Sequence, residues 1–162
     1  MDVDELEAWL EAMATKALPG GLAAAAVGGA MGAALVAKSA QATLRHQTPD
    51  GPARATLRAA RARARTQQQV LVELARADER AYRAVLDRSQ AASESSVLAG
   101  DFEERQARSA ATEIPIRVAE ICRGVLEDVS SWKSLCWPAV RPDLEVGIEL
   151  LGVGVRTGLQ VA

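Results

Sequence analysis

Apolar residues recur at helical spacing along most of the chain. Near the N-terminus, Val3, Leu6, Leu10 and Met13 follow a start at Asp2 or Asp4 that suits a helix N-cap. A longer row with coiled-coil-like spacing comprises Leu57, Ala60, Ala64, Gln67, Leu71, Leu74, Asp78, Ala81 and Val85. These rows predict an N-terminal helix that ends before Pro19 and a long helix from Pro52 to about Gln90.

Turn and cap residues divide the rest of the chain into further helices. The pattern predicts additional helices over about 22–44, 101–111, 115–131 and 142–162. The Ser-rich segment 91–100 and residues 132–141 are expected to connect them, and Val153–Val155 could equally form a strand. The sequence therefore predicts an all-α fold, an up-down bundle of about six helices in a single domain spanning residues 1–162.

Composition supports this fold and adds an expectation about helix contacts. Of 162 residues, 33 are alanine, only 3% are aromatic, and 49% are hydrophobic, which favours a folded helical chain. Glycines gather in the second predicted helix (Gly28, Gly29, Gly32) and in the last one, where they allow close approach of another backbone. Because two-fold pairs are the commonest oligomers, we expect a homodimer.

Charge and cysteine content narrow the class of protein. The 19 basic and 21 acidic residues give a net charge of -2, so we expect neither nucleic acid nor a membrane as partner. Residues 17–37 are uncharged, but their Ala and Gly content favours a buried helix over a membrane span. An acidic N-terminus and two isolated cysteines, Cys122 and Cys136, predict a cytoplasmic protein with reduced thiols and no metal site.

Two aspartates are the candidate catalytic residues. Asp78 interrupts the apolar row, or seam, that runs from Leu57 to Val85. A carboxylate in such a place must be hydrogen-bonded, paired or protonated, and a raised pKa would suit general acid-base catalysis. The alternative is a structural Asp78 paired with an arginine. Asp143 follows Pro142 in the first turn of the last helix, where the helix dipole alone favours an acid.

Candidate substrate-binding residues lie at both ends of the second predicted helix. Gly20 and Gly21 precede it and could present backbone N–H groups to a ligand, or simply form a turn. Arg45 and the sole histidine, His46, follow it, and Trp137 could stack on a planar ligand or pack at the bundle end. An arginine-rich patch is expected either to bind an anionic ligand tail or to be a solvated helix face; it comprises Arg45, Arg54, Arg58, Arg61, Arg63 and Arg65.

Four short motifs occur in order along nearly the whole chain. They are Pro19-Gly20-Gly21 before an Ala-rich helix, Asp78-Glu79-Arg80-Ala81-Tyr82, Ala111-Thr112-Glu113-Ile114-Pro115 with Val118-Ala119-Glu120, and Pro142-Asp143 before a Gly-rich helix. In this order they resemble the formiminotransferase-cyclodeaminase C-terminal family. That family includes formiminotetrahydrofolate cyclodeaminase and methenyltetrahydrofolate cyclohydrolase. The resemblance implies an enzyme that closes or opens a C–N ring of a tetrahydrofolate one-carbon derivative. Asp78 and Asp143 would handle protons, and no metal or redox cofactor would be required.

Several positions depart from the family's pattern. Leu22 and Ala23 replace a Gly and a Ser, Pro142 replaces a Ser, Cys136 and Trp137 replace a Gly-Asn, and Arg45-His46 stands for a Lys-rich stretch. These changes make the expected small-molecule pocket more apolar. They leave two alternatives open, a cyclase that acts on a non-folate substrate and a non-catalytic dimeric partner protein.

Overall fold

A computed structural model describes the chain except for residues 1–2, 48 and 93–100. Its elements are α1 (Val3–Thr15), α2 (Gly21–His46), α3 (Gly51–Ala92), α4 (Asp101–Ser130), the 3-10 helices η1 (Lys133–Leu135) and η2 (Pro138–Val140), and α5 (Arg141–Val161). No strand occurs in the described part of the chain, which confirms the all-α prediction and assigns Val153–Val155 to a helix. Most of the predicted 91–100 connection lies outside the described residues.

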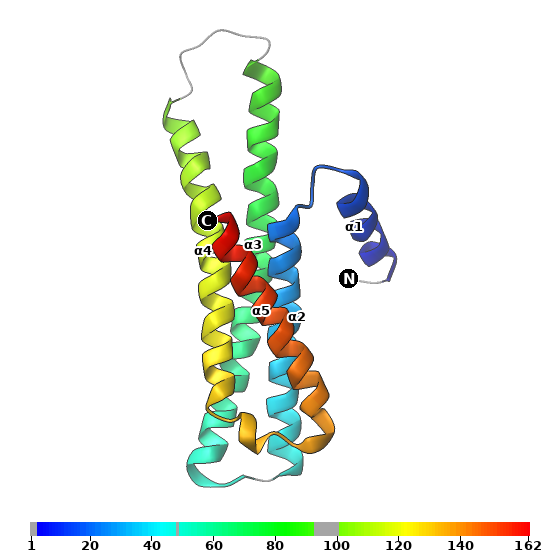
Figure 1. The fold of residues 1–162 in the computed structure, drawn as a ribbon, viewed down its shortest axis with the longest axis vertical. Coiled ribbons are helices and arrows are strands. Elements are labelled where there is room, and N and C mark those ends of the chain that lie inside the picture. Colours follow the sequence, from blue (N-terminus) through cyan, green and yellow to red (C-terminus); the bar gives the residue numbers. More distant parts are fainter. Residues whose placement is uncertain (1–2, 48, 93–100) are drawn as a thin grey trace.

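Helices α2, α3, α4 and α5 form an up-down bundle (Figure 1). The core consists of small and aliphatic side chains from all four helices, among them Ala33, Val36, Leu71, Val125 and Leu151. The seam predicted on α3 is buried from Leu57 to Leu74 and opens towards solvent beyond Asp78. The periodic row on α3 therefore extends beyond the part of this helix that the core buries.

The predicted break before Pro115 is wrong, because α4 runs continuously through this residue. A proline inside a helix removes one backbone hydrogen bond and usually ends or kinks it. Here Ile114, Pro115 and Val118 are all buried, and a Cβ at Gly158 of α5 would lie 2.5 Å from the Pro115 carbonyl oxygen. Burial of this face against α5 offsets the lost hydrogen bond, so two predicted helices are one.

The glycine-rich helices do meet at close contacts. A Cβ at Gly32 would lie 2.7 Å from the Gly147 carbonyl oxygen, which places the α2 and α5 backbones against each other. Cys122 of α4 fills a second contact: its Sγ would be 2.8 Å from a Cβ at Gly29 and 2.5 Å from one at Gly154. The absent side chains at these glycines are therefore what allows α2, α4 and α5 to pack.

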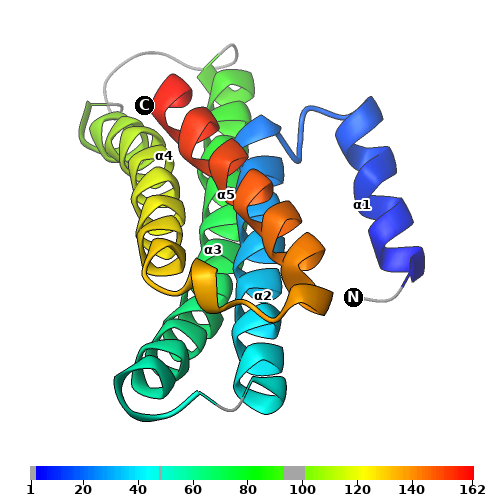
Figure 2. The same cartoon turned by 60° about the horizontal axis from the view of Figure 1, so that its bottom comes forward.

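Two helices have unusual surroundings. Helix α1 lies beside the bundle rather than in it (Figures 1 and 2), and none of its described residues is buried. Helix α2 is long and apolar enough to cross a membrane by length and composition, yet 56% of its most apolar window is buried inside the bundle. Such burial is typical of a core helix, which is what the sequence predicted for residues 17–37.

Candidate functional site

Asp78 lies on α3 and accepts a hydrogen bond from the backbone N–H of Ala23, in the first turn of α2. The N-cap residue of α2 is Gly20, which has no side chain to cap the helix. The first N–H groups of an α-helix have no partner within the helix, so a carboxylate from a neighbouring helix can satisfy one of them. The structure thus brings Asp78 together with the predicted Gly20-Gly21 segment.

The Asp78 carboxyl is half-buried, and its protonation differs from that of a solvated aspartate. Burial raises its pKa, the neighbouring Glu79 raises it further, and the hydrogen bond from Ala23 opposes both. A Cβ at Gly20 or Gly21 would meet nothing within 4 Å, so the surroundings of both residues are open. This end of α2 therefore combines a carboxyl that holds its proton more readily with accessible backbone at a helix N-terminus.

The other predicted residues gather at the C-terminal end of α2. His46 stacks on Trp137, with ring centroids 3.9 Å apart and an interplanar angle of 16°. The backbone N–H of Trp137 donates to Thr43 Oγ1 at 3.0 Å, and the Ser39 hydroxyl donates to the Val140 carbonyl at 3.4 Å. These buried hydroxyls fix the η1–η2 segment to α2, so the position of Trp137 is determined by the fold.

Asp143 has a partner that sequence reasoning missed. Its carboxylate forms an ion pair with Lys38 Nζ at 2.8 Å, and both side chains remain partly exposed. Lys38 is the only charged residue between Gly21 and Leu44, and this isolation in an Ala- and Gly-rich helix was the available signal. Arg45 is exposed near the same end of α2. This second cluster thus contains a carboxylate, a cation and a stacked aromatic pair.

A single chain does not bring Asp78 and Asp143 into one pocket. Ala23, the partner of Asp78, and Lys38, the partner of Asp143, are fifteen residues apart on α2. At the helical rise per residue this separates the two clusters by about 22 Å. Within one chain the two carboxylates therefore do not share a pocket, because their partners lie on different turns of α2.

The predicted arginine patch is divided between two surroundings. Arg63 makes a bidentate pair with Asp128 at 2.7 and 2.6 Å. This pair borders a shallow groove of about 320 Å³ between α3 and α4, lined by Arg63, Gln67, Glu120, Ile121, Gly124, Val125 and Asp128. The remaining arginines, Arg54, Arg58, Arg61 and Arg65, are exposed and recur along one face of α3.

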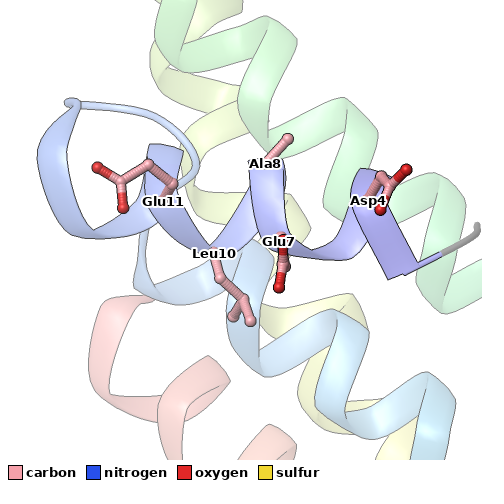
Figure 3. Close-up of a pocket in the computed structure, with 5 residues that line it drawn as sticks. All are labelled: Asp4, Glu7, Ala8, Leu10 and Glu11. Carbon is pink, nitrogen blue, oxygen red and sulfur yellow. The ribbon is translucent and has the colours of Figure 1, made fainter.

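One hollow lies against α1. It measures about 650 Å³, is open to solvent, and its described lining belongs to α1: Asp4, Glu7, Ala8, Leu10 and Glu11 (Figure 3). Its acidic lining offers little to an anionic substrate. Across the described ranges, no group of three or more His, Cys, Asp or Glu side chains could hold a metal ion.

Neither cysteine has the features of a nucleophile. Cys122 and Cys136 are free and buried. Burial raises the pKa of the Cys122 thiol to about 11 and also raises that of Cys136. A catalytic cysteine needs the opposite shift.

Trp132 is completely buried and its indole N–H has no hydrogen-bond partner in the described structure, so it packs in the core rather than stacking on a ligand.

Comparison with known proteins finds a family whose model matches nearly the whole chain. A family model for formiminotransferase-cyclodeaminase matches residues 5–161. A comparison with curated proteins finds no match. The match extends over the bundle, α1 and both clusters at the ends of α2.

Proposed function

Because the chain belongs to the formiminotransferase-cyclodeaminase family, we propose that it is a diverged enzyme of the cyclodeaminase or cyclohydrolase type. It would close or open a C–N ring, and a tetrahydrofolate one-carbon derivative is its first expected substrate. The observation that carries the proposal is the Asp78 carboxyl, whose pKa is raised beside the open N-terminal end of α2.

The proposed chemistry needs proton transfer and no redox step. In ring opening, water adds to the ring carbon, the C–N bond breaks, and the departing nitrogen takes a proton. In ring closure with loss of ammonia, a secondary amine nitrogen attacks the imino carbon and gives up its proton. The imino nitrogen takes up protons and leaves as ammonia when its bond to that carbon breaks. Asp78 would supply or accept this proton. Asp143, which is held by Lys38 about 22 Å away in the same chain, would supply the second carboxylate only where a second chain brings it to Asp78. No metal or redox cofactor is part of the proposal.

A non-catalytic role is the second candidate, and one specific observation favours it. The hydrogen bond from Ala23 to Asp78 gives this carboxyl a structural task, because it caps a helix whose own N-cap is glycine. In addition, Leu22 and Ala23, which replace a Gly and a Ser of the family's pattern, are buried. A repurposed bundle acting on a non-folate ligand or a protein partner would retain both features.

The test is a spectrophotometric assay with 5,10-methenyltetrahydrofolate, which loses its methenyl chromophore when the ring opens. We expect turnover by the wild-type protein and a loss of at least a hundredfold in Asp78→Asn and in Asp143→Asn, in line with about 10²–10⁴ for a general acid or base. Asp87→Asn, an exposed aspartate on α3, is the matched control and should retain activity.

Two outcomes would contradict the proposal. If the wild-type protein does not accelerate the reaction over buffer, and releases no ammonia from a formimino-folate, the folate activity is absent. If the wild-type protein is active but Asp78→Asn is equally so, the activity does not use this carboxyl, and the capping role alone explains Asp78.

A further inference from the structure

Tyr82 is an exposed aromatic residue in the same row of α3 as Asp78. At alternating spacings of four and three residues, this row comprises Leu71, Ala75, Asp78 and Tyr82. Leu71 and Ala75 are buried, yet Tyr82 is 47% exposed. The reason is the start of α2, whose first turn lies beside Asp78, while α3 continues past it (Figures 1 and 2). Tyr82 therefore faces the core side of α3 at a level that α2 does not cover.

The Tyr82 ring extends back towards Asp78. In an α-helix the Cα–Cβ bonds tilt towards the N-terminus, and a long side chain covers the turn that precedes its own. For Tyr82 that turn carries Asp78, four residues earlier. An aromatic ring and a carboxyl therefore lie next to each other at the start of α2, where a Cβ at Gly20 or Gly21 would meet nothing within 4 Å. We call this arrangement the Tyr82–Asp78 face.

Neither group of the Tyr82–Asp78 face is saturated by contacts among the described residues. The Asp78 carboxyl accepts one hydrogen bond, from the backbone N–H of Ala23, and no arginine in the described part of the chain pairs with it. A carboxyl has further acceptor positions, so most of its capacity is left for a ligand. Tyr82 makes neither a ring contact nor a hydrogen bond with another described residue.

An aromatic ring beside a carboxyl matches a planar ligand with a polar edge. Aromatic side chains bind flat rings by stacking, and a carboxyl binds the N–H groups at the edge of a ring. Burial favours the protonated form of Asp78, which both donates and accepts a hydrogen bond. A fused nitrogen heterocycle combines a flat face with an edge on which N–H groups alternate with nitrogen lone pairs, so it satisfies both groups at once.

We propose that Tyr82 is a substrate-binding residue, whose ring stacks on a fused nitrogen heterocycle and places a nitrogen of that ring system at the Asp78 carboxyl. Pterins and purines belong to this class of ligand. The catalytic consequence rests on the proposed function, whereas the binding of a flat ring does not. Because Tyr82 stacks on the ligand and transfers no proton, its loss should raise KM, while the loss of the Asp78 carboxyl should lower kcat.

The single tyrosine of the chain allows a test of stacking without any assay of activity. Protein that carries isotope-labelled tyrosine gives ring signals in NMR spectra from Tyr82 alone, and the ring current of a stacked ligand shifts these signals upfield. We expect a saturable upfield shift on titration with folic acid, which has an aromatic pterin, or with guanosine. 4-Aminobenzoylglutamate, the part of folic acid without the fused ring, is the matched control ligand and should leave the signals unchanged.

Substitutions at Tyr82 separate stacking from apolar bulk. Tyr82→Phe keeps the flat ring and should bind folic acid as tightly as the wild type. Tyr82→Leu and Tyr82→Ala lack that ring and should each weaken binding by about tenfold or more, as expected for the loss of stacking on a base. Arg83→Ala, at an exposed position on another face of α3, is the control and should bind normally. Calorimetry measures Kd, and circular dichroism checks that each variant stays helical.

The outcomes separate the Tyr82–Asp78 face from the proposed function. If no ligand shifts the Tyr82 signals, or if Tyr82→Ala binds folic acid as tightly as Tyr82→Phe, the proposal is overturned even where the wild-type protein opens the methenyl ring. An equal shift with 4-aminobenzoylglutamate would contradict a fused heterocycle as the ligand. Stacking of folic acid or guanosine without turnover of any folate would retain the face and retire the proposed function. An active enzyme whose Tyr82→Ala variant has a raised KM and an unchanged kcat supports both.

Discussion

Asp78 lies on α3 but hydrogen-bonds to α2, where Ala23 donates its backbone N–H to the carboxylate. We predict that Asp78→Ala lowers the free energy of unfolding by about 1 kcal/mol, the typical effect of losing a helix cap. Asp78→Asn keeps an acceptor oxygen and removes the cost of a partly buried charge, so its stability should equal or exceed that of the wild type. Urea denaturation of the three proteins at neutral pH measures the difference. Equal losses in both variants would show that the carboxylate charge, not its acceptor oxygen, stabilises α2.

Cys122 gives a pH dependence whose sign follows from its burial. The thiol holds its proton in the folded protein up to a pKa of about 11, compared with 9.0 for an ordinary cysteine. Between these values the folded state binds more protons than the unfolded state, so stability falls as the pH rises. We predict a decline in melting temperature from pH 9 to 11 that is shallower in Cys122→Ala. Parallel curves for the two proteins would contradict the assignment of this decline to Cys122.

At the scale of helices, one sulfur atom fills the contact between α4 and α5 at Gly154. A Cβ at Gly154 would lie 2.5 Å from Cys122 Sγ but no closer than 3.4 Å to any other atom. We therefore predict that Gly154→Ala costs roughly 1–3 kcal/mol of stability, as overpacking does. Adding Cys122→Ala removes the sulfur and should recover most of this loss.

Urea denaturation of both single variants and the double variant completes a thermodynamic cycle. Gly124→Ala on α4 is the control, because a Cβ there would meet nothing within 4 Å, and it should be neutral or stabilising. Additive losses in the double variant would mean that Gly154 is required for another reason than the sulfur.

The helices themselves could be predicted from local patterns, whereas their continuity could not. The apolar spacing on α3 and the turn at Pro49–Gly51 give the bounds of α2 and α3 to within a few residues. Pro115 misled the prediction because a proline ends most helices, and its burial against α5 depends on a residue 43 positions away, Gly158. Local rules cannot include a contact between Pro115 and Gly158.

At the scale of the whole molecule, the sequence predicted which residues belong to the candidate site but not how they lie relative to one another. Asp78 stood out because a carboxylate interrupts an apolar row, and Asp143 because of its motif. Asp78 is on α3 and Asp143 is on α5, and the distance between them depends on which turn of α2 each aspartate contacts. The spacing of residues within α3 or within α5 does not determine those contacts. Lys38 was missed for the same reason, since its pairing with Asp143 exists only in the folded chain.

If the site forms between two chains, inactive variants should restore each other. In a dimer of one Asp78→Asn chain and one Asp143→Asn chain, one site carries both substitutions and the other carries neither. Random exchange makes half of the dimers mixed, so co-refolding equal amounts of both variants should recover about a quarter of the wild-type activity. Each variant refolded alone should remain inactive. If each site lies within a single chain, every site carries one substitution and mixing recovers nothing.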